Sequence, residues 1–385
     1  MQYGQIFKKN GSWTLRYWDI TMEGKVRKSV KLARIGPDYP SRSSVATLAE
    51  KYLSPVNSSQ LQAESSMPVS QFIKDYYLPH VKKELRPSTY VDYKTIYNTH
   101  LKDHLGTIRL RDFRTLHGQK IMRSITGNGH NSLLRIKSFL SGVFKHAKRE
   151  GFLDGLNPMQ DVSVPGRPKK FKGETYTLDE IQEIIEIIYK YDRQASAVIA
   201  VAAFAGLRSS EIRGLRWSDY DGQTLTIRRS IWRTHVGETK TEASEGSVPV
   251  LPVLKKVLDD HQTRAKGGPD AYIFSGERLN RPLNLANLVR RVIIPKLEEE
   301  NSKRWDEAQT EPGVTVMIER VRFKGFHAFR RSLATNLYSC GVSPKVIQAI
   351  LRHSDIGTTL AYYVGVPDDE ARSALNKIEE WLSVV

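Results

Sequence analysis

Two polar connectors interrupt the hydrophobic pattern of this 385-residue chain, and they constrain its fold more than any other feature. The first, residues 54–68, reads SPVNSSQLQAESSMP and is rich in serine. The second, residues 162–180, reads VSVPGRPKKFKGETYTLDE and combines two prolines with four cations. Such stretches separate units that bury their own cores. The sequence therefore predicts three domains, at residues 1–55, 68–165 and 166–385, with a linker at 56–67.

The first predicted domain is a small antiparallel β-sheet followed by a helix at residues 44–52. Polar and apolar side chains alternate along SWTLRYWDI, so Leu15 and Tyr17 face one way and their neighbours the other. VRKSVKLA alternates in the same way after a turn at residues 23–25. One face can form a core, while the other is either a DNA-binding surface or a solvated charged face. Its candidate DNA contacts are Arg16, Trp18, Arg27 and Lys31.

The second predicted domain is all-helical. Apolar residues recur at helical spacing between residues 133 and 147, which is typical of one buried face of a bundle helix. Cations lie off that stripe and can face phosphates, or they can simply be solvated. These candidate DNA contacts are Arg135, Lys137, Lys145, Lys148 and Arg149.

The positive charge of the chain is unevenly distributed. The formal net charge is +17, of which residues 1–60 carry +6, residues 61–171 carry +10 and residues 172–385 only +1. A concentrated basic surface is expected of a protein that binds nucleic acid. A basic protein that is merely soluble is the alternative.

Several protein classes are disfavoured by composition. The single cysteine, Cys340, excludes an intrachain disulfide and leaves too little sulfur for a cysteine-based zinc site. The longest apolar run, near residues 195–205, is shorter than the about 20 residues of a membrane span. No dense cluster of acidic residues is present to hold a metal. We therefore expect no cofactor, no membrane partner and a cytoplasmic location.

The third segment holds three patches that carry chemistry. In the first, AFAGLRSSEIRGLRWSDYD, an apolar helix ends at Gly206 and Arg208 follows before the next helix begins. The planar guanidinium of an arginine held there suits bidentate binding of a phosphate. Glu211 can brace Arg208, and a purely structural Arg–Glu pair is the alternative.

The second patch, THVGETKTEASEGS, is predicted as a hairpin between strands at residues 224–232 and 245–251. It exposes Lys240, which can reach a DNA groove or donate a proton, or be an ordinary loop charge. The third patch spans residues 326–363. There His327 and Arg330 are three residues apart and share a helix face.

The patches resemble one family when taken in order. GLRSSEIRGLRWSD, TKTEASEGSVPV, HAFRRSLATNL and LRHSDIGTTLAYY resemble the motif set of the tyrosine recombinases, the phage-integrase family. The resemblance covers residues 172–385. It extends more loosely to the helical segment, which looks like the family's core-site DNA-binding domain. The first 55 residues resemble the arm-site domains of integrases from phages and conjugative elements.

The resemblance implies a multidomain fold: a small β-sheet plus helix domain, an all-α core-binding domain, and a mainly α (α+β) catalytic domain. It also implies six catalytic residues, namely Arg208, Lys240, His327, Arg330, His353 and the nucleophile Tyr362. The family places the nucleophile nine residues after the second histidine, which selects Tyr362 over Tyr363. One departure is visible, because the common Gly-His pair of the family is Arg352-His353 here. Arg352 either adds a phosphate or partner contact or is solvated.

The activity implied is that of an integrase of a mobile element. Its partners would be double-stranded DNA, at core-type and arm-type sites, and three more copies of itself in a tetramer on DNA. A DNA-bending accessory protein and an excisionase are further expected partners, and an amphipathic helix at residues 367–385 would dock on a neighbouring subunit. The alternatives are a catalytically inactive DNA-binding regulator, a type IB topoisomerase and a metal-dependent nuclease.

Overall fold

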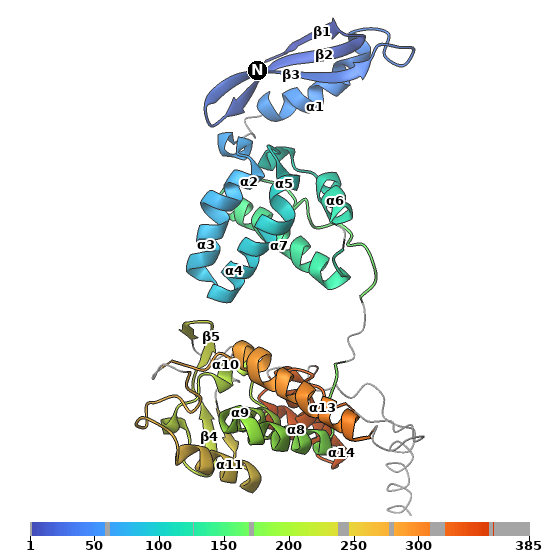
Figure 1. Cartoon of the computed structure of the whole chain (residues 1–385). Helices are drawn as coiled ribbons and strands as arrows, with labels where there is room; N and C mark the ends of the chain where they lie inside the picture. Colours follow the sequence, from blue (N-terminus) through green and yellow to red (C-terminus); the bar gives the residue numbers. More distant parts are fainter. Residues whose placement is uncertain are drawn as a thin grey trace, which may run out of the picture. The chain divides into compact units, whose positions relative to one another are not determined.

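The computed structural model describes residues 2–57, 62–125, 127–168, 173–237, 246–276, 281–308, 320–353 and 357. The chain divides into two compact units, Met1–Lys170 and Phe171–Val385 (Figure 1). Within the described ranges, no helix is both long enough and apolar enough to cross a bilayer.

The first unit opens with a three-stranded antiparallel sheet. It consists of β1 (Gln5–Lys9), β2 (Ser12–Thr21) and β3 (Gly24–Arg34), in the order β1-β2-β3. A short 3-10 helix, Ser43–Val45, leads into α1 (Ala46–Asn57), which covers one face of the sheet (Figure 1). Leu15 and Tyr17 are buried against Ala49, so the alternation predicted for β2 is confirmed. The helix is displaced from the predicted residues 44–52 toward the C-terminus.

The open face of this sheet, opposite α1, carries the four predicted DNA contacts. The strand register places Arg27 beside Trp18, and Lys31 beside Thr14, on the same side as Arg16. Two of the cations lie over aromatic rings. The guanidinium of Arg27 is 5.9 Å from the centre of the Trp18 ring, and the guanidinium of Arg16 is 4.6 Å from the centre of the Phe7 ring. Trp18 is 50% exposed, which is unusual for a tryptophan and indicates a surface available to a partner.

The rest of this unit is helical. Its elements are a 3-10 helix Ala63–Ser66, α2 (Val69–Phe72), α3 (Leu78–Glu84), α4 (Pro87–Ile96), α5 (Lys102–Leu105), a 3-10 helix Leu110–Asp112, α6 (Thr115–Ser124) and α7 (His130–Arg149). π-helical turns at Ile73–Tyr77 and Tyr97–Leu101 join α2 to α3 and α4 to α5. The expected linker at 56–67 overlaps the end of α1 and the 3-10 helix Ala63–Ser66.

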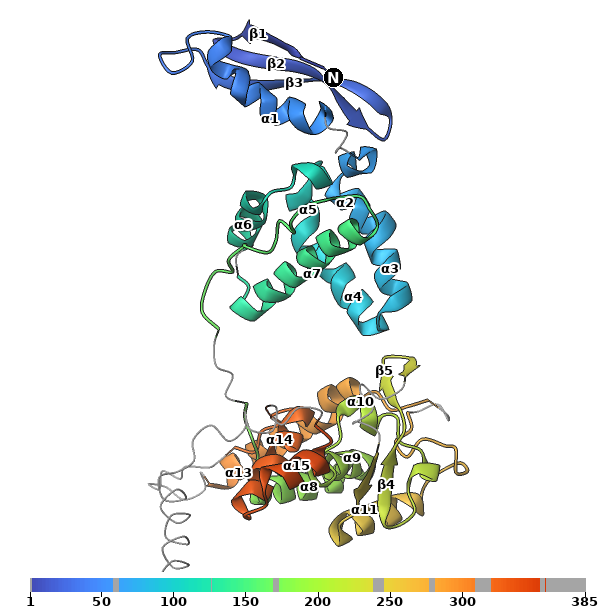
Figure 2. The same ribbon diagram turned by 180° about the vertical axis from the view of Figure 1, so that it is seen from behind.

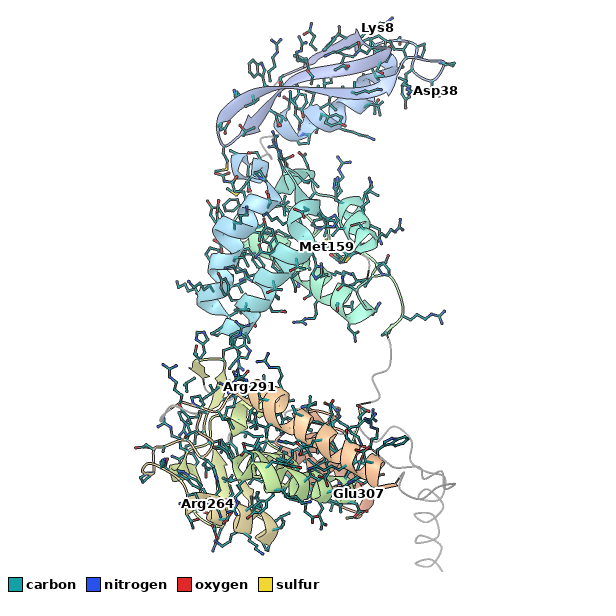
Figure 3. All side chains as sticks on the ribbon, in the orientation of Figure 1. Lys8, Asp38, Met159, Arg264, Arg291 and Glu307 are labelled. Atoms are coloured by element: carbon teal, nitrogen blue, oxygen red, sulfur yellow. The ribbon has the colours of Figure 1, made fainter. Side chains whose placement is uncertain are left out.

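The apolar stripe of α7 forms the centre of the helical core, as its spacing predicts. Phe139, Leu140, Val143 and Phe144 are all fully buried. The chain after α7 returns across α6, where Met159 is also fully buried (Figure 3). A Cβ atom at Gly118 of α6 would lie only 2.7 Å from Met159 Sδ, so this crossing requires a glycine.

The five cations of α7 differ in their surroundings. Arg135 forms an ion pair with Asp92, 2.5 Å apart, and Lys137 Nζ donates to the Gln160 carbonyl at 3.3 Å. The remaining three, Lys145, Lys148 and Arg149, are exposed. Arg135 is exposed as well, with its side chain 65% accessible, so four of the five cations can reach a phosphate.

A buried carboxylate joins the sheet to the helical part of the first unit. Asp19 of β2 is 3% exposed and accepts hydrogen bonds from Arg109 at 3.0 Å and Arg111 at 2.7 Å. Arg111 also donates to the Ile20 carbonyl at 2.8 Å, and Lys28 Nζ lies 3.7 Å from the carboxylate. Arg109 immediately precedes the 3-10 helix Leu110–Asp112, and Arg111 lies within it. Removing a buried carboxylate that three cations share leaves uncompensated positive charge.

The second unit is a helical domain with two small antiparallel strand pairs. Its helices are α8 (Leu178–Tyr191), α9 (Arg193–Phe204), α10 (Ser209–Ile212), a 3-10 helix Trp217–Asp219, α11 (Pro252–Gln262), α12 (Leu285–Leu288), α13 (Ile294–Ala308), α14 (Phe326–Ser339) and α15 (Pro344–Leu351). A π-helical turn, Val289–Ile293, joins α12 to α13. Every residue from 195 to 203 in α9 is buried, as its apolar run predicts. α14 packs on α9, and α15 packs on α14 (Figure 2).

The prediction of a single strand at residues 224–232 is wrong. The structure divides it into β4 (Thr224–Ile227), which pairs with β7 (Gly246–Pro249), and β5 (Ser230–Trp232), which pairs with β6 (His235–Gly237). The break has a physical cause. Arg229 donates to the buried carboxylate of Asp219 at 2.7 Å and to the Gly214 carbonyl at 3.1 Å, which draws it out of the strand pattern.

We predict that Asp19→Asn loosens the N-terminal sheet. The substitution leaves Arg109 and Arg111 without a counter-charge, which costs about 3–5 kcal/mol for a buried pair. Amide hydrogen exchange in β2 and β3 should therefore become faster. Asp38→Asn is the matched control, because Asp38 is exposed on the loop after β3 (Figure 3). Equal exchange in the two variants would contradict this role for Asp19.

Candidate active site

The candidate site begins where α9 ends. Gly206 takes a left-handed backbone conformation (φ 60°), which stops the helix, and Arg208 then precedes α10. Glu211 in α10 is 2% exposed and holds Arg208 at two points. Its Oε1 accepts from Arg208 Nη1 at 2.6 Å, and its Oε2 accepts from the Arg208 backbone N–H at 2.9 Å. The predicted brace is confirmed, and the Arg208 side chain remains 28% exposed.

Arg330 lies on α14 and is 2% exposed. Its Nη1 donates to the Gly206 carbonyl at 2.5 Å, and its Nη2 donates to the Leu351 carbonyl. These carbonyls belong to the C-terminal ends of α9 and α15, where helices leave acceptors without internal partners. A cation there is also favoured by the negative end of each helix dipole. Arg330 therefore fixes three helices relative to one another.

His327 lies one helical turn before Arg330 on α14 and keeps contact with solvent. Partial desolvation, and then the positive charges of Arg331, Arg330 and Arg208, lower the pKa of its imidazole. The neutral form has one ring nitrogen free to accept a proton. His327 therefore shares the cationic environment of Arg208 and Arg330.

His353 follows α15 and is 8% exposed. Its backbone is held by Gln348, whose carbonyl accepts from the His353 N–H and whose side-chain amide donates to the His353 carbonyl, each at 3.0 Å. Burial, and then the surrounding cations led by Arg330 and Arg208, lower the pKa of His353 to about 4. The imidazole is consequently neutral at pH 7 and can donate one hydrogen bond.

The sequence did not decide whether Arg352 makes a contact or is solvated. It ends α15 in the left-handed conformation (φ 53°, ψ 50°), which costs roughly 1–2 kcal/mol for a residue with a Cβ. It is 7% exposed, and its Nη2 donates to Glu211 Oε2 at 3.0 Å. Arg352 is therefore buried in the site and is not solvated. The departure from the Gly-His pair was the sequence signal for it.

Two of the six predicted catalytic residues are not among the described ones. Lys240, Tyr362 and the expected helix at 367–385 lie outside the described residues. The described chain resumes at Gly246, where a Cβ atom would lie 3.5 Å from Arg352 Cδ. β7 therefore begins beside the cationic cluster. In the described ranges, no group of three or more His, Cys, Asp or Glu side chains is placed to hold a metal.

The chemistry of this cluster is that of an anion site. The guanidiniums of Arg208 and Arg352 share the carboxylate of Glu211, and that of Arg330 bonds main-chain carbonyls. With both histidines neutral, the formal charge of these groups is positive. Guanidiniums bind phosphate oxygens through short, charge-assisted hydrogen bonds. A phosphodiester is the ligand that fits both this charge and the basic first unit.

Two family models match the chain. The phage integrase family matches residues 174–369, and the N-terminal SAM-like domain of phage integrases matches residues 69–125. A tyrosine recombinase XerC-like protein of Caldanaerobacter subterraneus subsp. tengcongensis is 23% identical over 409 residues, covering 97% of this chain and 98% of that protein. The transposase of transposon Tn916 from Enterococcus faecalis is 23% identical over 327 residues, covering 78% of this chain and 75% of the transposase.

Solved structures share the fold. The integrase of transposon Tn1549, in complex with transposon right end DNA, superimposes with a TM-score of 0.62 at 18% identity, covering 81% of this chain and 100% of the other. A λ integrase tetramer bound to a Holliday junction gives a TM-score of 0.56 at 18% identity, covering 93% of this chain and 94% of the other. The predicted multidomain fold class is thereby confirmed.

The family model covers residues 174–369, half of the chain, and includes all four described members of the predicted catalytic set. These four come from α14 and from the two loops that follow α9 and α15. The chain therefore belongs to the phage integrase family, that of the tyrosine recombinases.

Proposed function

We propose that this protein is a site-specific DNA recombinase that integrates, and also excises, a mobile element. It cuts and rejoins DNA strands through a covalent 3′-phosphotyrosyl intermediate. The observation that carries the proposal is the fixed pair of Arg208 and Arg330 beside His353. Membership of the tyrosine recombinase family supports the same reaction.

The two arginines act on the scissile phosphate. Attack on a phosphodiester adds negative charge to the non-bridging oxygens of the pentavalent transition state. Groups that are already oriented stabilise such charge without paying for reorganisation during the reaction. Glu211 orients Arg208, and two main-chain carbonyls orient Arg330. The neutral His353 adds a hydrogen bond to the same oxygens.

Proton transfer completes the step. Tyr362 is the nucleophile, and a phenol with an ordinary pKa of about 10 must lose its proton at or before attack. His327, neutral because its pKa is lowered, accepts that proton. Lys240 protonates the departing 5′ oxygen. One phosphate ester breaks as the tyrosyl ester forms, so a 5′-hydroxyl of another strand can reverse the step with no supply of ATP.

The basic surfaces of the first unit position the DNA in this proposal. Residues 1–55 form an arm-site domain that presents its open face, with Arg16, Trp18, Arg27 and Lys31. Residues 68–165 form the core-site domain, with α7 presenting Lys145, Lys148 and Arg149. Residues 166–385 form the catalytic domain. Four copies assemble on DNA in the cytoplasm, with the C-terminal helix docking on a neighbour and with a DNA-bending protein and an excisionase as accessory factors.

The central test is covalent trapping. We expect labelled DNA spanning the gene's own flanks, nicked to trap intermediates and kept free of metal, to form an SDS-resistant adduct with the wild type. Tyr362→Phe should abolish the adduct because it removes the only oxygen that attacks. Tyr363→Phe is the matched control and should retain it. Gel electrophoresis after SDS treatment reads out both variants.

Other outcomes of trapping would change the assignment. Loss of the adduct only in Tyr363→Phe would keep the mechanism and move the nucleophile by one residue. Tight binding without an adduct, on DNA that contains the crossover site, would indicate a DNA-binding regulator. Efficient relaxation of supercoiled DNA without strand exchange would indicate a topoisomerase.

The neutral state of His353 predicts a pH dependence of stability. Because its pKa is about 4 in the folded protein and about 6.5 in the unfolded chain, the unfolded chain binds more protons between these values. The contribution of neutral His353 to the free energy of unfolding is fully present above about pH 6.5. It is lost as the pH falls toward 4, by at most about 3 kcal/mol.

Thermal unfolding between pH 4 and 7 measures this effect. We expect His353→Gln, which cannot titrate, to flatten the fall of Tm with acid. His235→Gln, at an exposed position of β6, is the control and should retain the wild-type slope. A His353→Gln slope equal to that of the wild type would show that this imidazole is not buried in its neutral form.

A further inference from the structure

Glu211 carries two guanidiniums on one carboxylate. Arg208 occupies Oε1 through its side chain and Oε2 through its backbone N–H, and Arg352 occupies Oε2 through Nη2. The side chains of Glu211 and Arg352 are 2% and 5% exposed. A single negative charge compensates one of these cations and leaves the other in excess. Without Arg352, the charge of Glu211 would cancel that of Arg208.

The left-handed backbone conformation of Arg352 costs free energy that a glycine at the same position would avoid. Glycine adopts the left-handed conformation freely, and a side chain disfavours it. In the part of the chain that the structure describes, only Asn10, Arg233 and Arg352 combine a side chain with a positive φ. Strained residues of this kind cluster where the surrounding structure uses them.

The guanidinium of Arg352 is incompletely paired. Its Nε and Nη1 are buried and have no hydrogen-bond partner among the described residues. A buried polar atom left unpaired costs free energy. Arg352 is thus neither a surface cation nor a saturated structural pair. Its contact with the rest of the site is the hydrogen bond to Glu211, through which its positive charge offsets that carboxylate.

We propose that Arg352 is a positioning residue of the recombination reaction, which bonds Glu211 and offsets its negative charge, so that the positive charge of Arg208 acts on the scissile phosphate. Because Arg352 offsets the negative charge of Glu211, more of the positive potential of Arg208 remains at the non-bridging oxygens. It touches Glu211 and not the reacting atoms. This inference rests on the proposed function, because it concerns the same phosphate.

The test compares wild type with Arg352→Gly under single-turnover conditions, with protein in excess over nicked DNA. Glycine fits the left-handed position, so the variant is expected to fold. We expect the rate of adduct formation on the natural phosphodiester to fall about tenfold, equivalent to about 1.4 kcal/mol of transition-state stabilisation. Arg233→Gly is the matched control, since Arg233 is also left-handed but is exposed at the β5–β6 turn, and should keep the wild-type rate.

A second substrate separates charge from structure. A methylphosphonate at the scissile position replaces one non-bridging oxygen by a methyl group and removes its negative charge. If Arg352 acts on that charge, Arg352→Gly and wild type should react with this substrate at rates within about threefold of each other. A tenfold defect on both substrates would overturn the proposal, because it would indicate a structural role.

Two further outcomes are distinguishable. An Arg352→Gly rate equal to the wild-type rate on the phosphodiester would overturn this inference and leave the proposed function intact. Absence of any adduct from the wild type on DNA containing the crossover site would overturn the proposed function itself, and this inference with it.

Discussion

The buried carboxylate of Glu211 is the interaction on which the candidate site depends. It lies in α10, one turn after Arg208, and it joins the loop after α9 to the end of α15 through Arg352. A carboxylate with 2% exposure is stable only if it is paired and hydrogen-bonded. Here three donors supply that pairing, two from Arg208 and one from Arg352, and they fix the two chain segments that border the candidate site. The geometry of the site therefore follows from the burial of one acid.

Arg330 is also a buried charged group, and main-chain carbonyls compensate its positive charge. Its guanidinium bonds the carbonyl ends of α9 and α15. Each helix C-terminus carries roughly half a negative charge, so two of them offset about one cation. Because carbonyl groups are not protonated at ordinary pH, these two contacts hold the buried arginine in place over a wide pH range.

Sequence patterns located the parts of this fold that depend on neighbours along the chain. Alternation in β2, the stripe of α7 and the glycine stop before Arg208 are local features, and each was correct. The division of residues 224–232 was missed because Arg229 finds Asp219, a partner ten residues away that no periodicity reveals. The Asp19 joint was missed for the same reason, since its arginines lie about ninety residues further along. Ion pairs between distant segments leave no periodic signal.

The candidate site divides in the same way. Motif order predicted Arg208, His327, Arg330 and His353 as catalytic residues. In the structure, the charges of Arg208 and Arg330 lower the pKa of both histidines, so the four residues share one cationic environment. Motif order alone could not assign Arg352, because a residue that departs from a pattern gains its meaning from what it contacts. The pKa of His353 is lowered by the same cations that would bind the phosphate. The same cluster of positive charge therefore keeps both histidines neutral, and in the proposed reaction it would also bind the phosphate.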